Sequence, residues 1–344
     1  RVDQFYQKTS LPPLYQTLLT ERQEEFDKGL VDPETLLYKQ ELVEILSACT
    51  ACGSWSFSEP FVSFLSNSYS ECLSCGTLFR NPRLRPEVFS DLLEDSETVR
   101  KWIERAAANY KPDADSHDEL FSRVEALLGK KDIRYCDIGA RCGDLVNQAS
   151  RRSWEAWGVE PSNAACEFMK SNGLSCKNDL FTSDLFEEGS FDFITLENVI
   201  LNLYDPQTLF NDIGKSLKKN GILHFRDFNR HSFGFQLYDK RYRALMGRNS
   251  IIIPSNKGLS AILARAGFAA LETKTDYMDI LPEDFVAIFK GQVCYWGTGN
   301  AYLPQGSNIF DNKSQRAAFV AGLTTIAENQ NLGAYYSILA RKTH

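Results

Sequence analysis

From residue 134 onward, short apolar runs with strand character alternate with amphipathic helical stretches. The strand-like segments lie at 134–138, 156–160, 174–177, 191–196 and 221–228. Strands that alternate with helices along the chain form a parallel sheet with helices on both faces. The pattern therefore predicts an α/β fold with a Rossmann-like sheet.

Two helices late in the chain have clear signals at both ends. One opens at Asp205, a capping acid followed by proline, and is expected to run to the glycine at 221. The other is expected over 255–267, because it ends at a glycine and leads into an alternating strand at 268–275. A last strand is predicted at 335–340.

Before the sheet, the character of the sequence changes several times. The first segment has a helical pattern, with a helix expected to start at Asp32 and to carry an apolar stripe through Leu46. A stretch rich in Ser, Cys and Gly follows, then further helical patterns. The predicted organisation is an N-terminal helical segment at 1–48, a small module at 49–86, a helical linker at 87–129, and a main domain at 130–344 with an insertion at 285–333.

Four of the nine cysteines form two CxxCG pairs. These are Cys49, Cys52, Cys72 and Cys75, and the glycine after each pair permits a tight turn around the sulfur atoms. Four thiolates fill a tetrahedral Zn²⁺ site and leave no position for water, so the expected role is structural. The remaining cysteines are scattered, which does not indicate a disulfide framework. They are Cys136, Cys142, Cys166, Cys176 and Cys294.

The composition is that of an ordinary globular protein, with 43% hydrophobic and 24% charged residues. No uncharged apolar run approaches the length needed to cross a bilayer, and the first residues lack a signal-peptide pattern. We therefore expect a soluble, cytoplasmic protein without a membrane partner. A net charge of −7 disfavours a nucleic-acid partner, because phosphate binding depends on clustered Lys and Arg.

A glycine turn follows the strand at 134–138. Asp137, Gly139 and Gly143 surround this turn, and Glu160 ends the next strand about twenty residues later, where an acid can accept hydrogen bonds from ribose hydroxyls. An NAD site would need a G-x-G-x-x-G run. Gly139 and Gly143 are four positions apart with Arg141 between them, so the NAD interpretation is disfavoured.

With this loop, the acid at Glu160 and the run L-K-K-N-G-I-L at 217–223, the chain resembles the class I methyltransferases that use S-adenosylmethionine (SAM). The resemblance covers 130–275 and the last strand. The run from Cys75 to Arg83 is similar to that of bacterial zinc-containing methyltransferases, several of which act on sugars or small metabolites. The resemblance implies a SAM-dependent methyltransferase.

The same resemblance implies a set of SAM-binding residues. The loop at 139–143 would pass the methionine part of SAM, and Arg141 stands where the family has its middle glycine. Glu160 would hold the ribose, Asp179 and Leu180 would border the adenine, and Glu197 would lie beside the sulfonium. The full set is Asp137, Gly139, Ala140, Arg141, Gly143, Glu160, Pro161, Asp179, Leu180, Glu197 and Asn198.

In such folds the acceptor meets the cofactor beyond the carboxyl ends of the strands, which points to the loops at 197–204 and 226–235. His231 and Asp227 are the candidate proton acceptors there, and the alternative is that His231 is an ordinary loop residue and Asp227 a strand-end cap. Cations interleaved with aromatic residues between 226 and 243 would grip a small anionic acceptor such as a nucleotide-sugar, or form one solvated helix face.

Two alternatives stay open on the sequence alone. The zinc module could present an RNA substrate to the same catalytic domain, although the acidic net charge counts against this. Alternatively, the chain could be a SAM-binding scaffold without activity, because Arg141 replaces a glycine and no Glu-His pair follows the strand at 191–196.

Overall fold

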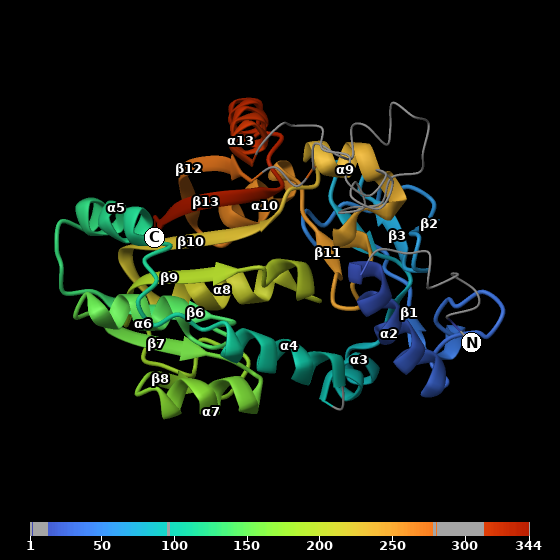
Figure 1. The fold of residues 1–344 in the computed structure, drawn as a ribbon, viewed down its shortest axis with the longest axis horizontal. Coiled ribbons are helices and arrows are strands. Elements are labelled where there is room, and N and C mark those ends of the chain that lie inside the picture. Colours follow the sequence, from blue (N-terminus) through green and yellow to red (C-terminus); the bar gives the residue numbers. More distant parts are fainter. Residues whose placement is uncertain (1, 3–12, 95–96, 278–279, 281–312, 344) are drawn as a thin grey trace. The chain divides into compact units, whose positions relative to one another are not determined.

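The computed structural model describes residues 2, 13–94, 97–277, 280 and 313–343 (Figure 1). The chain divides into two compact units, and each unit is assembled from several chain segments. Unit 1 comprises 1–95, 228–258 and 274–336, and unit 2 comprises 96–227, 259–273 and 337–344.

A seven-stranded sheet with the order β12-β13-β10-β9-β6-β7-β8 is the centre of the α/β fold (Figure 1). The strands from β6 to β10 pair in parallel. The last strand runs opposite to β10, because Lys342 bonds the carbonyl of Leu217 while Ser337 bonds His224. The strands are β6 (Arg134–Ile138), β7 (Glu155–Val159), β8 (Ser175–Lys177), β9 (Phe191–Glu197), β10 (Leu217–Phe228), β12 (Phe268–Asp276) and β13 (Tyr335–Lys342).

The predicted Rossmann-like sheet is therefore confirmed, and most of its strands lie within a residue or two of the expected ranges. β10 is the exception, because it starts at Leu217, directly after α8 (Pro206–Ser216). Leu217 already pairs with Phe191 of β9, and a register irregularity follows before Ile222. Asp205 caps α8 as expected, with its Oδ1 accepting the N–H of Thr208 at 3.2 Å.

A hydrophobic core cluster of unit 2 joins the sheet to α5, α6 and α7. Phe121 of α5 stacks on Trp154 with the ring centroids 4.7 Å apart, and it meets Tyr135 of β6 and Phe193 of β9 edge-on. This packing holds the first turn of α5 over the amino-terminal halves of β6 and β9, to which Tyr135 and Phe193 belong. The helices of the unit are α4 (Glu97–Ala108), α5 (Asp118–Leu128), α6 (Asp144–Arg151), α7 (Asn163–Ser171), α8, and α10 (Asn256–Arg265), whose first residues belong to unit 1.

Unit 1 contains a small antiparallel sheet with the order β11-β4-β3-β2. Its edge strand β11 comes from far along the chain, with Ile252 opposite Phe79 and Ile253 opposite Leu78. The remaining elements are β1 (Val43–Glu44), β2 (Phe61–Val62), β3 (Ser68–Glu71), β4 (Leu78–Arg80), β5 (Arg83–Leu84), β11 (Ile252–Ile253), α2 (Pro13–Asp27), α3 (Pro86–Glu94), α9 (Phe233–Tyr238) and α13 (Lys313–Asn329).

The helix expected to start at Asp32 is absent, and that prediction is wrong. The Asp32 carboxylate accepts the N–H groups of Glu34 at 3.0 Å and Thr35 at 2.9 Å, and Leu36 has a φ of 57°. Side-chain bonds of this kind close a local turn instead of a helix. The chain then leads into β1, and Ile45 is 81% exposed.

The segment interpreted as an insertion at 285–333 is only partly described. Residues 285–312 lie outside the described part, and α13 occupies most of the remainder. Within the described residues, no helix combines the length and the apolar character needed to span a bilayer.

Candidate functional site

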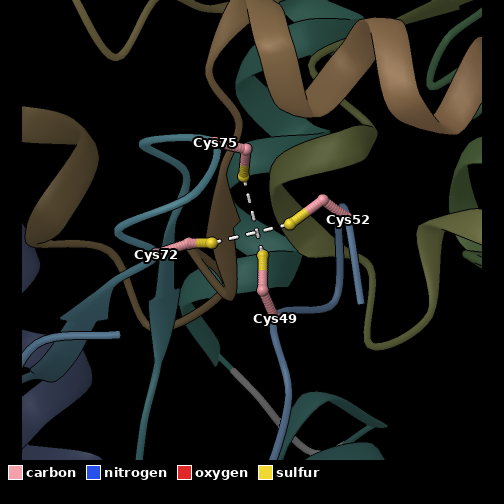
Figure 2. Close-up of side chains that lie close together, drawn as sticks. All are labelled: Cys49, Cys52, Cys72 and Cys75. Atoms are coloured by element: carbon pink, nitrogen blue, oxygen red, sulfur yellow. Dashed lines mark hydrogen bonds between the residues drawn. The ribbon is translucent and has the colours of Figure 1, made fainter. Parts of the chain in front are cut away.

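The four cysteines of the CxxCG pairs converge on one point (Figure 2). Their Sγ atoms all lie within 4.8 Å of one another, with 3.8 Å between Cys49 and Cys75 and 3.5 Å between Cys52 and Cys72. A tetrahedral zinc with Zn–S bonds of about 2.3 Å needs sulfur atoms about 3.8 Å apart. The predicted four-cysteine cluster is therefore confirmed, and its dimensions fit Zn²⁺.

Backbone turns shape both halves of this cluster. Gly53 donates its N–H to the carbonyl of Cys49 at 2.8 Å, and Gly76 donates to Cys72 at 2.7 Å. Both glycines have a left-handed φ, 76° and 79°, which is the conformation the CxxCG spacing predicted. Ser255 supports the second turn by donating its hydroxyl to the carbonyl of Cys75.

In unit 2, the glycine turn between β6 and α6 is closed tightly against its neighbours. Gly139 has a φ of 72°, and a Cβ built there would lie 2.7 Å from Cγ2 of Val199. Gly143 caps α6 with a φ of 83°. Both positions therefore need glycine, as the loop pattern indicates.

The Glu160 carboxylate is held at this turn by backbone donors. Its Oε2 accepts the N–H of Arg141 at 2.9 Å, its Oε1 accepts the N–H of Ser162 at 2.9 Å, and the residue is 7% exposed. Arg141 has a φ of 48° and an exposed side chain. Its backbone thus follows the left-handed path of a glycine, and only its main chain takes part in the turn.

The glycine turn lies where the strand order of the sheet reverses. Ile138, the last residue of β6, pairs with Val159 on one side and with Leu196 on the other. Glu160 follows Val159 and Glu197 follows Leu196, so the two acids flank the glycine turn at the carboxyl ends of the strands. Open α/β sheets bind ligands at this kind of switch point.

Asn178 connects the loop after β8 to the carboxyl end of β7 by hydrogen bonds. Its amide donates to the carbonyls of Glu160 at 3.0 Å and Pro161 at 2.9 Å. The neighbouring Asp179 accepts the N–H of Leu180 at 2.8 Å, and Leu180 is 68% exposed. The two residues expected to border adenine therefore follow β8 beside the end of β7.

Asp137 is buried beneath the turn. Its Oδ1 accepts the hydroxyl of Thr195 at 2.6 Å, and Thr195 in turn lies 2.5 Å from the hydroxyl of Tyr135. Burial raises the pKa of Asp137 to about 7, and the nearby Glu197 carboxylate adds to the effect. Asp137 is therefore a buried carboxyl that changes charge near neutral pH.

One ion pair at the carboxyl end of β9 was not predicted from the sequence. Nε2 of His117 lies 2.8 Å from Oε1 of Glu197, and the two side chains are 24% and 22% exposed. His117 caps α5 and precedes the whole strand pattern, 80 residues from its partner. No spacing rule connects residues that far apart.

The two candidate proton acceptors lie in different units. Asp227 belongs to unit 2, is fully buried, and accepts the N–H of Leu201 at 3.1 Å. His231 belongs to unit 1, where its ring lies against Gly76 of the cysteine cluster, about 3.7 Å from an added Cβ. Burial lowers the pKa of His231, and Arg230 lowers it further. Their catalytic role stays a prediction.

In the mixed cationic and aromatic run after β10, the aromatic residues are packed inside unit 1, while Lys240 is exposed. Phe235, Tyr238 and Tyr242 are buried in a core cluster of unit 1. Arg230 lies over the ring of Phe235 at 4.4 Å, and Arg243 lies over Phe228 at 4.9 Å. These aromatic rings therefore pack on the chain itself.

Cys166 of α7 and Cys176 of β8 form a disulfide, with their Cα atoms 5.7 Å apart. Nothing in the sequence distinguishes these two from the other scattered cysteines. A separation of ten residues gives no signal of pairing, because the contact depends on α7 packing back on β8.

A hollow of about 500 Å³ on unit 2 includes none of the glycine-turn residues. It is lined by Arg134, Trp157, Lys177, Asp184, Leu185, Phe186 and Glu187. The hollow is therefore separate from the glycine turn and the acids that flank it.

Residues 113–273 match the family model described as a methyltransferase domain. No curated protein matches the sequence.

Several solved structures are similar to the chain. A putative sarcosine dimethylglycine methyltransferase from Galdieria sulphuraria is 18% identical, with 66% of this chain and 85% of that chain covered and a TM-score of 0.42. A possible histamine N-methyltransferase from Thermotoga maritima is 20% identical, with 71% and 95% covered and a TM-score of 0.42. Phosphoethanolamine N-methyltransferase 2 from Haemonchus contortus, in complex with SAM, is 15% identical, with 78% and 63% covered and a TM-score of 0.45.

Proposed function

The chain carries a class I SAM-dependent methyltransferase domain, and from this premise we propose that it transfers the methyl group of SAM to a small anionic acceptor. The observation that carries the proposal is the Glu160 carboxylate, held by two backbone N–H groups beside the glycine turn. Each oxygen accepts one of these bonds and keeps a further lone pair for a ribose hydroxyl. The net charge of −7 favours a small acceptor over a nucleic acid.

SAM supplies a methyl group that is already activated on a sulfonium. The task of the chain is therefore to hold and align the two reactants, which can lower the barrier by several kcal/mol. We assign the methionine part to the turn at 139–143, the ribose to Glu160 and the adenine border to Asp179 and Leu180. Glu197 and Asn198, which follow β9, are assigned to the sulfonium end.

A base is needed only if the acceptor is a weak acid. In that case we propose His231 or Asp227 as the proton acceptor. Removing the one that acts should lower turnover by about 10²–10⁴-fold and leave SAM affinity nearly unchanged. Full turnover in both His231→Ala and Asp227→Asn would mean that alignment alone suffices.

We further propose one structural Zn²⁺ per chain at the four-cysteine cluster. The sulfur separations fit a closed thiolate site, and the buried Tyr69 and Leu78 of the same segment pack in a cluster with residues far along the chain. Elemental analysis of pure protein should give one zinc per chain. Protein without zinc and with four freely titratable thiols would refute this assignment.

The SAM assignment is tested by titration calorimetry with SAM and with its demethylated product, S-adenosylhomocysteine. The wild type should bind both, and Glu160→Ala should weaken both, because the ribose loses its acceptor. Glu155→Ala is the matched control. Glu155 lies at the amino end of β7, the end away from Glu160, and its side chain is 57% exposed. No heat with either ligand, or equal losses in both variants, would overturn the proposal.

The acceptor is identified by incubating the protein with SAM and a panel of nucleotide-sugars and biosynthetic intermediates. The expected result is one compound that gains the mass of a methyl group in the presence of the wild type. Mass gain on RNA instead, with none on small molecules, would contradict the acceptor class.

A further inference from the structure

Polar and charged side chains share one face of the sheet in unit 2, at the carboxyl ends of its central strands. The register pairs Asp137 and His224 with Thr195, and Arg226 with Glu197. Residues paired across parallel strands, and residues two apart along a strand, lie on the same face. These five side chains therefore form one polar patch beyond the aromatic core.

His117 closes over this patch from the start of α5. Its Nε2 faces Glu197 at 2.8 Å, its Nδ1 faces the hydroxyl of Ser116 at 2.9 Å, and its backbone N–H donates to Gln148 at 3.2 Å. Both ring nitrogens are thus engaged and the ring orientation is fixed. About a quarter of each side chain of the pair stays exposed, 24% for His117 and 22% for Glu197.

We propose that the His117–Glu197 pair distinguishes SAM from S-adenosylhomocysteine by charge. This inference rests on the proposed function, which brings the cofactor to the switch point beside Glu197. Methyl transfer converts a sulfonium cation into a neutral thioether, so the cofactor loses one positive charge. A carboxylate at the end of β9 attracts SAM more strongly than the product, and the charge on His117 sets how much of that attraction is available.

Charged groups face this pair from three other elements. Asp137 reaches it from β6, His224 and Arg226 from β10, and Asp144 from α6. Burial lowers the pKa of His224 to about 4, so this residue is neutral at physiological pH. Arg226 keeps its charge throughout. Asp137, with a pKa of about 7, can titrate in the same range and is tested separately.

The effect has a definite sign. Burial lowers the pKa of His117, but the Glu197 and Asp137 carboxylates outweigh it, so the pKa lies above the usual value of 6.5. Below that pKa, the imidazolium neutralises Glu197 and the cationic sulfonium gains little. Above it, the imidazolium charge is gone, so Glu197 attracts the sulfonium more strongly and SAM is favoured. The ratio of SAM affinity to product affinity therefore rises with pH, by about tenfold for each pH unit by which SAM lowers the pKa of His117.

The experiment measures both affinities by calorimetry on the zinc-loaded 344-residue chain between about pH 6 and pH 8.5, the range in which histidine changes charge. His117→Asn removes the titrating ring, and Glu197→Gln removes the carboxylate at nearly constant shape. Asp137→Asn measures how much of the pH dependence of the affinity ratio comes from Asp137 and not from His117. Glu155→Gln is the matched control, because Glu155 is an exposed acid at the amino end of β7, away from the pair.

In the wild type and in Glu155→Gln we expect the affinity ratio to rise about tenfold across this range. In His117→Asn, the affinity ratio should stay near the value that the wild type has at high pH, and most of its increase with pH should be lost. In Glu197→Gln, the affinity ratio should stay near the low-pH value of the wild type at every pH. Asp137→Asn should retain most of the rise. Ionisation of the ligands themselves is common to all variants and cancels in the comparison.

The imidazole NMR signals give a second readout that a merely structural role would not move. The His117 signal, assigned by its loss in His117→Asn, should report a lower pKa with SAM bound than with the product bound. A wild-type rise that persists in His117→Asn, or an unchanged ratio in Glu197→Gln, would overturn the inference while SAM binding stands. A wild type that binds neither ligand would overturn the proposed function and this inference together.

Discussion

At the residue scale, Arg141 shows how a departure from a glycine pattern is accommodated. Its φ of 48° places the backbone where glycine is usual, while its N–H bonds Glu160 and its side chain stays exposed. Left-handed backbone costs an L-residue roughly 1–2 kcal/mol, and β-branched residues tolerate it least. The turn therefore depends on the main chain at this position and not on the guanidinium.

We predict that Arg141→Gly keeps the SAM affinity of the wild type and is at least as stable. Arg141→Val should lose about 1–2 kcal/mol of unfolding free energy, because a branched side chain resists a positive φ. Denaturant unfolding and SAM calorimetry on the two variants measure this. A large loss of SAM affinity in Arg141→Gly would show that the guanidinium itself holds the ligand.

Asp137 predicts a pH dependence of stability with a definite direction. Its pKa is raised by burial from 3.8 to about 7 in the folded state, so the folded state holds a proton that the unfolded state releases between these values. Its contribution to stability is full below about pH 3.8 and is lost as the pH rises through about 7. The difference of about three pH units corresponds to on the order of 4 kcal/mol as an upper bound.

Asp137→Asn should remove this dependence. The free energy of unfolding of the variant, measured relative to the wild type by urea titration, should improve between about pH 4 and pH 8 by up to this amount. The comparison cancels the titration of other groups common to both proteins. A difference that does not change with pH would mean that Asp137 is ionised throughout.

At the element scale, α2 is anchored in unit 1 by buried charges. Arg248 is 2% exposed, donates its guanidinium to the carbonyl of Glu21 at 2.6 Å and to Oε2 of Glu24 at 2.8 Å, and lies 3.5 Å from Glu25. Glu21 also accepts the backbone N–H of Arg248 at 3.0 Å. The helix therefore depends on a cation more than two hundred residues away along the chain.

We predict that Arg248→Ala destabilises the protein by about 3–5 kcal/mol, because it leaves the buried Glu21 carboxylate without its cation, whereas Glu25 keeps Arg22. The exposed Lys257 supplies the control, and Lys257→Ala should change stability by less than about 0.5 kcal/mol. Denaturant unfolding followed by tryptophan fluorescence measures both. Equal effects of the two substitutions would show that the ion pairs contribute no net stability.

At the scale of the whole molecule, the cysteine module is completed by a distant segment. β11 supplies the fourth strand of its sheet, and the carbonyl of Ser250 accepts bonds from Tyr69 at 2.7 Å and from Arg80 at 3.0 Å. Arg80 is 2% exposed and also bonds the carbonyl of Gly247 at 2.7 Å. Without these carbonyls, a buried guanidinium would lack acceptors, which is costly.

We therefore predict that residues 1–95, produced alone with zinc, bind the metal but show no cooperative thermal unfolding. The full chain with zinc should unfold cooperatively, and adding a chelator should lower its transition temperature, because metal binding is coupled to folding. Circular dichroism and zinc analysis on both proteins test this. A sharp transition in the fragment would mean that the module is self-sufficient.

Local signals in the sequence determined the order of strands and helices, the glycine turn and the pairing of the cysteine knuckles. Each of these depends on periodicity or on spacing within a few residues, where the physics of one turn or one strand decides. The helix expected after Asp32 failed for the same reason, since a side chain that bonds its neighbours' N–H groups is also a local competitor of the helix.

The contacts between distant residues were decided only by the tertiary structure. His117 meets Glu197 because α5 packs on the aromatic core above β9, Cys166 meets Cys176 because α7 folds back on β8, and β11 joins the cysteine module from another part of the chain. Such contacts arise when apolar faces are buried together, and the polar groups at their margins meet as a result. Sequence spacing carries no record of that packing, so these pairs become visible only once the chain is folded.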